Sequence, residues 1–173
     1  MESNYKQTNE NIYFACRKKA AIYNERLNSR EEAAELLGIS PSTLANHELG
    51  VTKNVPVDTV VMMADLYRAP ELRNHYCKYE CPIGKDLPMA TSVGSLELIT
   101  VQLLNEMDSE SIESMKSMLL KIASDGQVDD SELHAMNGIL KKLDGISEIT
   151  SQLKMLIEKC NGKEQENGTC RET

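Results

Sequence analysis

A histidine and two cysteines lie close together near the middle of the chain, and their side chains are ligands that zinc prefers. His75, Cys77 and Cys81 fall within seven residues, whereas the other cysteines are distant, at 16, 160 and 170. A tetrahedral zinc site needs a fourth ligand, which this cluster lacks. Three interpretations stay open: a metal site, a redox-responsive pair of Cys77 and Cys81, and ordinary thiols, of which ordinary thiols are favoured.

The segment 125–132 imitates the second half of a calcium-binding loop, with Gly126 at the turn and Glu132 in the place of the bidentate carboxylate. The first and third positions of such a loop would be a lysine and an alanine, which do not ligate calcium. We therefore expect one helix to end here and a new helix to begin, capped by Asp129 or Asp130.

No catalytic set emerges from the sequence. The three histidines, at 47, 75 and 134, are scattered, and no glycine-rich loop of the kind that cradles phosphate is present. We expect no enzyme activity, no bound metal and no other cofactor.

The composition is that of a folded, soluble protein. The chain has 173 residues, 40% hydrophobic and 27% charged, with no Trp and 1 Phe. A core must be built from aliphatic residues, and the length suffices for one domain or two small ones. No apolar run is long enough to span a membrane, and the N-terminus lacks the pattern of a secretion signal. Five scattered cysteines suit a reducing compartment, so a cytoplasmic location without membrane contact is expected.

Acidity is concentrated in the second half of the chain. Residues 1–88 carry 11 Lys and Arg against 12 Asp and Glu, whereas residues 89–173 carry 8 against 15. The first 30 residues contain six basic and three acidic side chains, a local excess of positive charge. If the protein binds nucleic acid, we expect the N-terminal half to do so, because a net negative surface repels phosphates.

Helical periodicity dominates the first half. Ile12, Cys16, Ala20, Tyr23 and Leu27 recur at steps of three and four residues, as on one stripe of a helix. Capping residues and prolines mark the later helix starts. The predicted helices span 10–27, 30–37, 40–49, Pro56 to Pro70, and 71 to about 77.

The second half also predicts an all-α fold. Residues 77–94 hold two prolines and two glycines without a clean period, so they are interpreted as a linker. Four apolar stripes follow, joined by short connections that favour antiparallel helical hairpins across 95–160. The stripes cover 96–107, 112–122, 133–143 and 146–160, with a break expected at Asp144-Gly145. Residues 161–173 are polar and aperiodic and are predicted to be a disordered tail.

The segment 29–50 carries the spacing of a helix-turn-helix motif. Ala34 leaves room for a second helix to cross closely, Gly38 fits the turn, and Leu44 points into the shared core. An ordinary helical hairpin is the alternative. The combination of these three residue types at this spacing favours the helix-turn-helix interpretation.

The run SREEAAELLGISPSTLANHELG, with RKKA before it and the helix of Pro56 after it, resembles the Cro/Xre type of lambda-repressor-like helix-turn-helix domain. This family comprises bacterial and phage transcription regulators. The resemblance covers residues 10–76 and implies a five-helix DNA-binding domain, with 95–160 as a dimerisation or effector domain. In such domains the second helix of the motif enters the major groove. The implied function is a sequence-specific regulator, expected to be a repressor, that binds operator DNA as a homodimer.

The resemblance also assigns roles to single residues. The recognition helix is Ser40 to Leu49, and Arg30 stands where the family usually has Gln. Asparagine suits adenine, serine and threonine suit several bases, and arginine suits guanine or a phosphate. The implied DNA contacts are Arg30, Ser40, Ser42, Thr43, Asn46, Lys53, Arg17 and Lys18. The implied structural residues are Ala34, Gly38, Leu44 and Glu48.

Some of these assignments carry a second interpretation. Glu48 resembles a structural partner of an arginine in the first helix, here Arg17, so that pair is expected to be architectural. Lys18 and Lys19 suit either phosphate contacts or a solvated face.

The sequence departs from the family pattern in three places. About five extra residues precede Ser29, His47 replaces a large apolar residue, and the recognition helix has no Lys or Arg. Weak non-specific DNA affinity is therefore expected, because phosphate neutralisation dominates that affinity. Two alternatives to a plain regulator stay open: a protein-interaction module without DNA binding, and a thiol- or metal-responsive regulator. A protein or small-molecule effector could act on 95–160.

Overall fold

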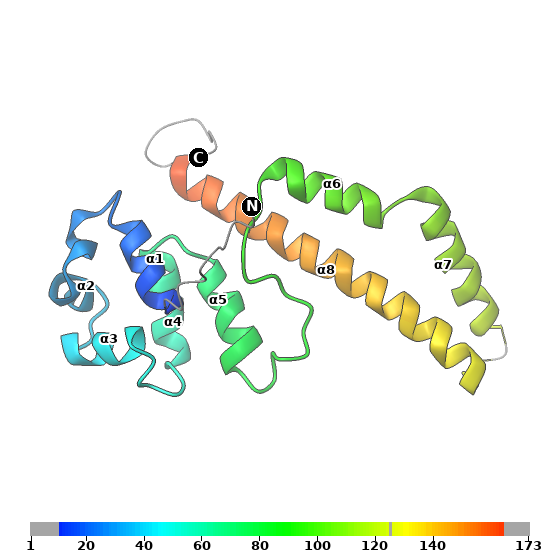
Figure 1. Ribbon diagram of the computed structural model, residues 1–173, viewed down its shortest axis with the longest axis horizontal. Helices are drawn as coiled ribbons and strands as arrows, with labels where there is room; N and C mark the ends of the chain where they lie inside the picture. The colour runs from blue at the N-terminus through cyan, green and yellow to red at the C-terminus, as the bar shows by residue number, and fades with distance from the viewer. Residues whose placement is uncertain (1–10, 125, 165–173) are drawn as a thin grey trace, which may run out of the picture. The chain divides into compact units, whose positions relative to one another are not determined.

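The computed structural model describes residues 11–124 and 126–164, and every regular element among them is a helix (Figure 1). The expected all-α class is thus confirmed for this part of the chain. The chain divides into two compact units, Met1–Lys85 and Asp86–Thr173. Among the described residues, no helix combines the length and the apolar character needed to cross a membrane.

The first unit is a cluster of short helices around one apolar core. Leu27, Leu44, Met63 and Leu72 are among its fully buried side chains. Polar side chains accept backbone N–H bonds at several helix starts. The elements are α1 (Ile12–Ala20), the 3-10 helix η1 (Glu25–Asn28), α2 (Arg30–Leu36), α3 (Pro41–Glu48), α4 (Val57–Leu66), α5 (Glu71–His75) and the π-helical turn η2 (Tyr76–Glu80).

The first helix is shorter than predicted, since α1 ends at Ala20 and the predicted 10–27 helix is wrong beyond that point. A turn follows, and the Asn24 side chain accepts the backbone N–H of Arg26 to start η1. Asparagine favours such local bonds over the interior of a helix. Leu27 still reaches the core through η1, and this explains why it fitted the apolar stripe.

The two helices of the predicted motif form with nearly the predicted bounds. Ser29 Oγ accepts the backbone N–H of Glu32 at 3.4 Å, which is one half of a capping arrangement. Its hydroxyl donates to the carboxylate of Glu31 at 2.9 Å. Gly38 after α2 and Gly50 after α3 both have positive φ, at 66° and 68°. These glycines end their helices in the left-handed conformation that glycine adopts without penalty.

The last helix of the first unit continues past its predicted end. Pro70 precedes α5, which passes into η2 and reaches Glu80. The first residues of the predicted linker 77–94 are therefore helical. Gly84 then comes so close to Cys77 that a Cβ atom would lie 2.3 Å from the carbonyl oxygen of Cys77.

The second unit is a long helix paired with two shorter ones. It contains α6 (Leu96–Glu106), α7 (Ser109–Ile122) and α8 (Asp130–Glu164). In Figure 1, α6 and α7 follow one another along α8 and run antiparallel to it. The backbone N–H of Gly94, just before α6, donates to Gln152 Oε1 at 3.3 Å. Lys142 Nζ donates to Ser111 Oγ and joins α7 to α8.

The predicted third and fourth helices of this unit are one continuous helix of 35 residues, so the break expected at Asp144-Gly145 is wrong. A glycine inside a helix costs about 1 kcal/mol relative to alanine. Burial of Ile139 and Ile149 on either side of this position opposes that cost. The helix extends to Glu164 and takes in the first residues of the predicted tail 161–173, the rest of which lies outside the described residues.

The turn before α8 is a helix start and not a calcium loop. Gly126 has a φ of 71°, and Asp129 Oδ1 accepts the backbone N–H of Glu132 at 2.8 Å. Glu132 Oε2 in return accepts the backbone N–H of Asp129 at 3.3 Å. This reciprocal arrangement is a capping box. It confirms the predicted capping by Asp129.

Candidate nucleic-acid interface

The crossing of α2 and α3 is built from small and apolar side chains. Ala34 of α2 and Leu44 of α3 are fully buried, as the motif predicted. The turn between the helices contains Gly38, where a Cβ atom would meet no other heavy atom within 4 Å. The requirement for glycine at this position is therefore set by its positive φ and not by space.

The start of α3 is held by its own hydroxyl groups. Ser40 Oγ accepts the backbone N–H of Thr43 at 3.1 Å, and lies 2.9 Å from Ser42 Oγ and 2.8 Å from Thr43 Oγ1. Thr43 is half-buried. Ser40 and Thr43 thus stabilise the start of α3.

Ser42 and Asn46 form the exposed polar face of α3. Both side chains are exposed and lie four residues apart, which places them on the same side of the helix. Within the described part of the chain, the Asn46 side-chain amide makes no hydrogen bond, so its donor and acceptor are both available to a ligand. An asparagine presented in this way can bind an adenine edge with two hydrogen bonds.

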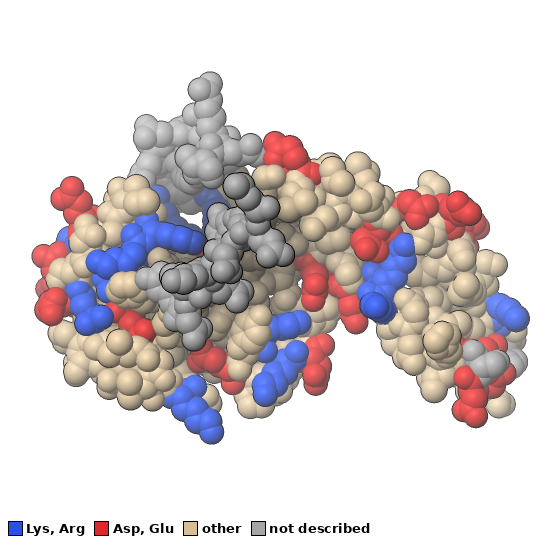
Figure 2. Space-filling view, viewed as in Figure 1, with Lys and Arg blue, Asp and Glu red and all other residues tan. Residues whose placement is uncertain are grey.

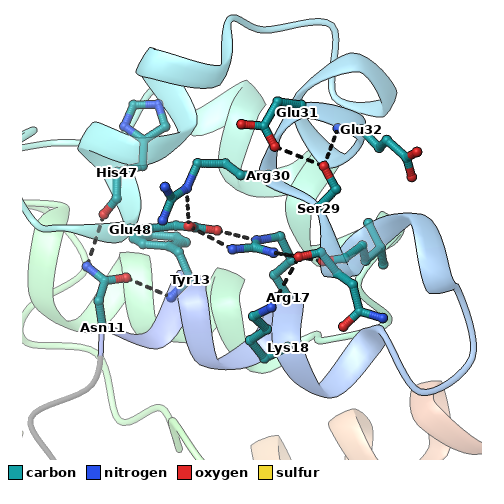
Figure 3. A network of polar contacts seen from close by, with 12 residues as sticks. Asn11, Tyr13, Arg17, Lys18, Ser29, Arg30, Glu31, Glu32, His47 and Glu48 are labelled. Carbon is teal, nitrogen blue, oxygen red and sulfur yellow. Dashed lines mark hydrogen bonds and ion pairs between the residues drawn. The ribbon is translucent and has the colours of Figure 1, made fainter.

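A buried ion pair joins the first helix to the end of α3 (Figure 3). Arg17 Nε donates to Glu48 Oε1, and Arg17 Nη2 donates to Glu48 Oε2 at 3.0 Å. The two side chains are only 2% and 1% exposed. Such a pair must be hydrogen-bonded on all sides to be tolerated in the interior. The pairing of Arg17 with Glu48 that the resemblance implied is present.

Arg17 is also bonded to the segment that precedes α2. Its Nη1 donates to the carbonyl oxygen of Leu27 at 2.7 Å and to that of Asn28 at 3.2 Å. With every nitrogen of the guanidinium engaged and the side chain buried, Arg17 has no surface to offer to DNA. The structure favours its architectural role over the implied DNA contact.

Arg30 shares the same carboxylate but lies at the surface. Its Nε donates to Glu48 Oε2 at 2.9 Å, and its side chain is 35% exposed. Because the bond to Glu48 uses Nε, the two terminal amino groups remain able to bind a phosphate or a guanine edge. Glu48 therefore holds the Arg30 side chain against the end of α3.

The other cations of this unit are dispersed. Lys18 Nζ donates to the carbonyl oxygen of Asn28 at 3.1 Å and lies 6.0 Å from the centre of the Phe14 ring. Lys19 and Lys53 are exposed. In Figure 2, Lys and Arg side chains gather over α1, whereas the surface over α3 is largely without them. The cations of the first unit therefore lie around α3 and not on it.

An acidic side chain lies beside Arg30. The pKa of Glu31 is lowered by its backbone hydrogen bond, then by the Ser29 hydroxyl and by nearby Arg30. Glu31 is fully exposed to water and stays anionic near neutral pH. The positive charge of Arg30 is thus partly offset by two carboxylates, those of Glu31 and Glu48. This balance weakens the general attraction to phosphates.

His47 occupies a buried position at the end of α3. Its Nδ1 lies 3.1 Å from Thr52 Oγ1, and its Nε2 has no hydrogen-bond partner within the described residues. Burial lowers the pKa of His47, an effect that the negative charge of Glu80 opposes. The ring is therefore neutral near pH 7, as its buried position favours.

Two polar residues that the sequence analysis overlooked position the loop after α3. Asn11 Oδ1 caps α1 by accepting the Tyr13 N–H at 2.9 Å, while Asn11 Nδ2 donates to the His47 carbonyl at 3.0 Å. Glu80 accepts the Val55 N–H at 3.1 Å and the Tyr13 hydroxyl. Burial raises the pKa of the Tyr13 hydroxyl, and the hydrogen bond to Glu80 together with the negative charge of Glu80 raises it further. The cap of Asn11 was readable from the sequence, but its contact with His47 was not.

The cysteine cluster does not assemble a metal site in the part of the chain that the structure describes. No group of three or more His, Cys, Asp or Glu residues there is placed to hold a metal ion. Cys77 and Cys81 are half-buried free thiols.

No protein-family model, curated protein or solved structure matches this chain. The crossing of α2 and α3, and the side chains exposed beside it, are the observations from which a function is inferred.

Proposed function

We propose that the chain is a sequence-specific DNA-binding regulator whose first unit is a lambda-repressor-like helix-turn-helix domain. The observation that carries the proposal is the exposed polar face of α3 formed by Ser42 and Asn46, together with the partly exposed guanidinium of Arg30, which is bonded to Glu48 of the same helix. Side chains of these types recognise base edges in the major groove. Regulation would follow from occupying a promoter, without any chemical step.

The phosphate contacts in this proposal surround α3. Arg30 lies on one side of the helix, at the start of α2, and Lys53 is exposed in the loop that follows α3. Lys18 contributes from α1. Because few cations take part and carboxylates lie close by, we expect binding to depend on base contacts more than on charge. The preference for a specific sequence should therefore be large relative to the weak non-specific affinity.

The experiment is selection of a preferred duplex from a random pool, followed by measured affinities of variants. Asn46→Ala should weaken binding to the selected duplex by about 1–3 kcal/mol and relax selection at one or two base positions. Lys53→Ala should weaken binding to all duplexes alike and lower the salt dependence by about one phosphate contact. Asn137→Ala, the same change at an exposed position of α8, is the matched control and should change neither property.

Two outcomes contradict the proposal. One is the absence of any duplex binding even at low salt. The other is binding that Asn46→Ala and Lys53→Ala leave unchanged, since the exposed face of α3 would then play no part.

A second candidate function, a protein-interaction module, is favoured by one observation. Leu49 and Val51, at the end of α3, are each 69% exposed, and α3 itself carries no Lys or Arg. Exposed apolar side chains next to an uncharged helix suit a protein partner better than a phosphate backbone. If duplex binding is absent and Leu49→Ser abolishes capture of a folded partner, this second function replaces the first.

A further inference from the structure

A cavity lies between α6 and α8 within the second unit. Its volume is about 290 Å³, which is at the small end of the range for ligand sites. At about 30 Å³ for each water-sized group, it has room for on the order of ten non-hydrogen atoms. Its lining includes Gln102, Asn105 and Glu106 of α6, and Gly145, Glu148 and Ile149 of α8.

The cavity carries negative charge. Glu106 and Glu148 contribute carboxylates from the two paired helices. Glu106 is the last residue of α6, where the helix dipole adds further negative potential. Lys142 Nζ lies 4.0 Å from Glu106 Oε2, at the limit of an ion pair, and also donates to Ser111 Oγ. Lys142 therefore offsets the charge of Glu106 only in part, and a ligand of this cavity should be positively charged.

Uncharged hydrogen-bond acceptors lie beside the carboxylates. Gln102 Oε1 is buried and has no hydrogen-bond partner within the described residues. Buried side-chain oxygens are rarely left without a donor, so this oxygen points to a donor that a ligand supplies. Asn105 adds an exposed amide from the same helix. An ammonium group has three N–H donors and no acceptor, and it thus matches a lining of carboxylates and amide oxygens.

Gly145 leaves the wall of the cavity open beside Glu106. A Cβ atom there would lie 3.7 Å from Glu106 Cδ and 3.8 Å from Glu106 Oε1, which is ordinary contact. Alanine would therefore fit the packing of α8 on α6, and it is the better helix former. Packing does not explain this glycine, whereas the space that it leaves in the cavity does. Gly138, earlier on the same helix, does not line the cavity, and a Cβ atom there would meet nothing within 4 Å.

We propose that the cavity between α6 and α8 binds a small aliphatic diamine. The carboxylates of Glu106 and Glu148 would bind its two ammonium groups, with the amide oxygen of Gln102 as a further acceptor. Its methylene chain would lie against Ile149 and in the space beside Gly145. The proposal goes beyond DNA binding and does not depend on it.

A divalent metal ion suits this cavity less well than a diamine does. Calcium takes six to eight oxygen ligands, mostly from carboxylates. No group of three or more His, Cys, Asp or Glu residues in the described part of the chain is placed to hold a metal ion. The cavity also has room for a chain of methylene groups, which a single ion would leave unfilled.

The test is isothermal titration calorimetry of the full chain with hexane-1,6-diamine, in the absence of DNA, which itself binds amines. We expect saturable binding at one site per chain that weakens as salt is added, because the contacts are between opposite charges. Hexylamine, which has the same chain and one ammonium group, should bind at least about tenfold more weakly. Glu106→Gln should weaken binding of the diamine by a similar factor, whereas Glu113→Gln, an exposed carboxylate on α7, should leave it unchanged.

The two glycines of α8 separate ligand binding from helix stability. Gly145→Ala and Gly138→Ala should each raise the melting temperature of the second unit by roughly 4–8 °C, because both replace a glycine inside a helix. Only Gly145→Ala adds a methyl group to the cavity, so it alone should weaken binding of the diamine, by at least about fivefold. Circular dichroism of each variant shows that a loss of binding is not a loss of folding.

Three outcomes overturn the proposal. The first is no saturable binding of the diamine at millimolar concentration and low salt. The second is equal affinity for the diamine and for hexylamine. The third is binding that Glu106→Gln and Gly145→Ala both leave unchanged, since the amine would then lie elsewhere. Because DNA is absent throughout, none of these results bears on the proposed DNA binding.

Discussion

Replacing Glu48 by glutamine should strongly destabilise the first unit. The carboxylate of Glu48 accepts two hydrogen bonds from Arg17 and one from Arg30, and its side chain is 1% exposed. Glutamine has nearly the same shape but carries no charge, so the buried Arg17 guanidinium loses its counter-ion. Leaving one partner of a buried ion pair unpaired typically costs about 3–5 kcal/mol.

The magnitude can be read in a thermal or urea unfolding experiment. For a unit of this size, each kcal/mol lowers the melting temperature by about 4–8 °C, so a fall on the order of 15–30 °C is expected for Glu48→Gln. Arg30→Gln is the matched control, because it removes a partially exposed donor from the same carboxylate. Ion pairs near the surface contribute about 0–1 kcal/mol, so its effect should be small.

A double variant distinguishes charge from packing. Replacing both Arg17 and Glu48 by methionine removes the pair without leaving a buried charge, and it should cost less than Glu48→Gln alone. Some cost should remain, because the carbonyl oxygens of Leu27 and Asn28 lose the donor that Arg17 provides. If Glu48→Gln melts within a few degrees of the unmodified chain, the reasoning from burial is refuted.

Three further predictions concern His47 and two glycines. Burial lowers the pKa of His47 below its unfolded value of about 6.5, so its contribution to stability is fully present above that pH and is lost as the pH falls toward the folded pKa. Urea unfolding should therefore give a smaller free energy of unfolding at pH 5.5 than at pH 7.5. His47→Leu should reduce this difference between the two pH values. Gly38→Ala should cost about 1–2 kcal/mol of unfolding free energy through its positive φ alone, and Gly38→Asn should cost less, since asparagine tolerates that conformation. Gly84→Ala should cost more than Gly38→Ala, on the order of 3 kcal/mol, because the added Cβ meets the backbone of Cys77; equal melting temperatures for the two variants would contradict this.

Helix boundaries that depend on local chemistry could be predicted from the sequence. The start of α3 at Pro41 follows from the Ser40 cap, and the end of α2 before Gly38 follows from a residue suited to positive φ. Each signal lies within a few residues of the boundary that it sets. The all-α class followed from such signals and from the periodicity of apolar residues.

Boundaries that depend on competition between local and distant contacts were predicted wrongly. Ala20 and Leu27 both face the core, and periodicity alone could not show that a turn and η1 connect them. Conversely, Gly145 suggested a break in α8, but burial against α6 and α7 carries the helix through. After α1 the local hydrogen bond of Asn24 starts a new element, whereas in α8 tertiary packing outweighs the cost of a glycine.

The candidate site likewise contains some features that the sequence predicted and others that depend on contacts between distant residues. Ser42, Asn46 and Arg30 were placed by their position in the motif, and the structure leaves each of them with some exposed surface. The contact of Glu80 with the backbone of Val55 joins residues 25 apart in the chain, and no pattern in the sequence predicts it.

The turn between α1 and η1 has a consequence for engineering the protein. Arg17 holds the carbonyl groups of Leu27 and Asn28, and the Tyr23 hydroxyl donates to the carbonyl of Tyr67, so side chains anchor the chain that follows Ile22. Ile22 precedes Tyr23 in this turn and is exposed, so this turn is a position where an inserted peptide or a fluorophore attached through a cysteine should leave the neighbouring helices intact.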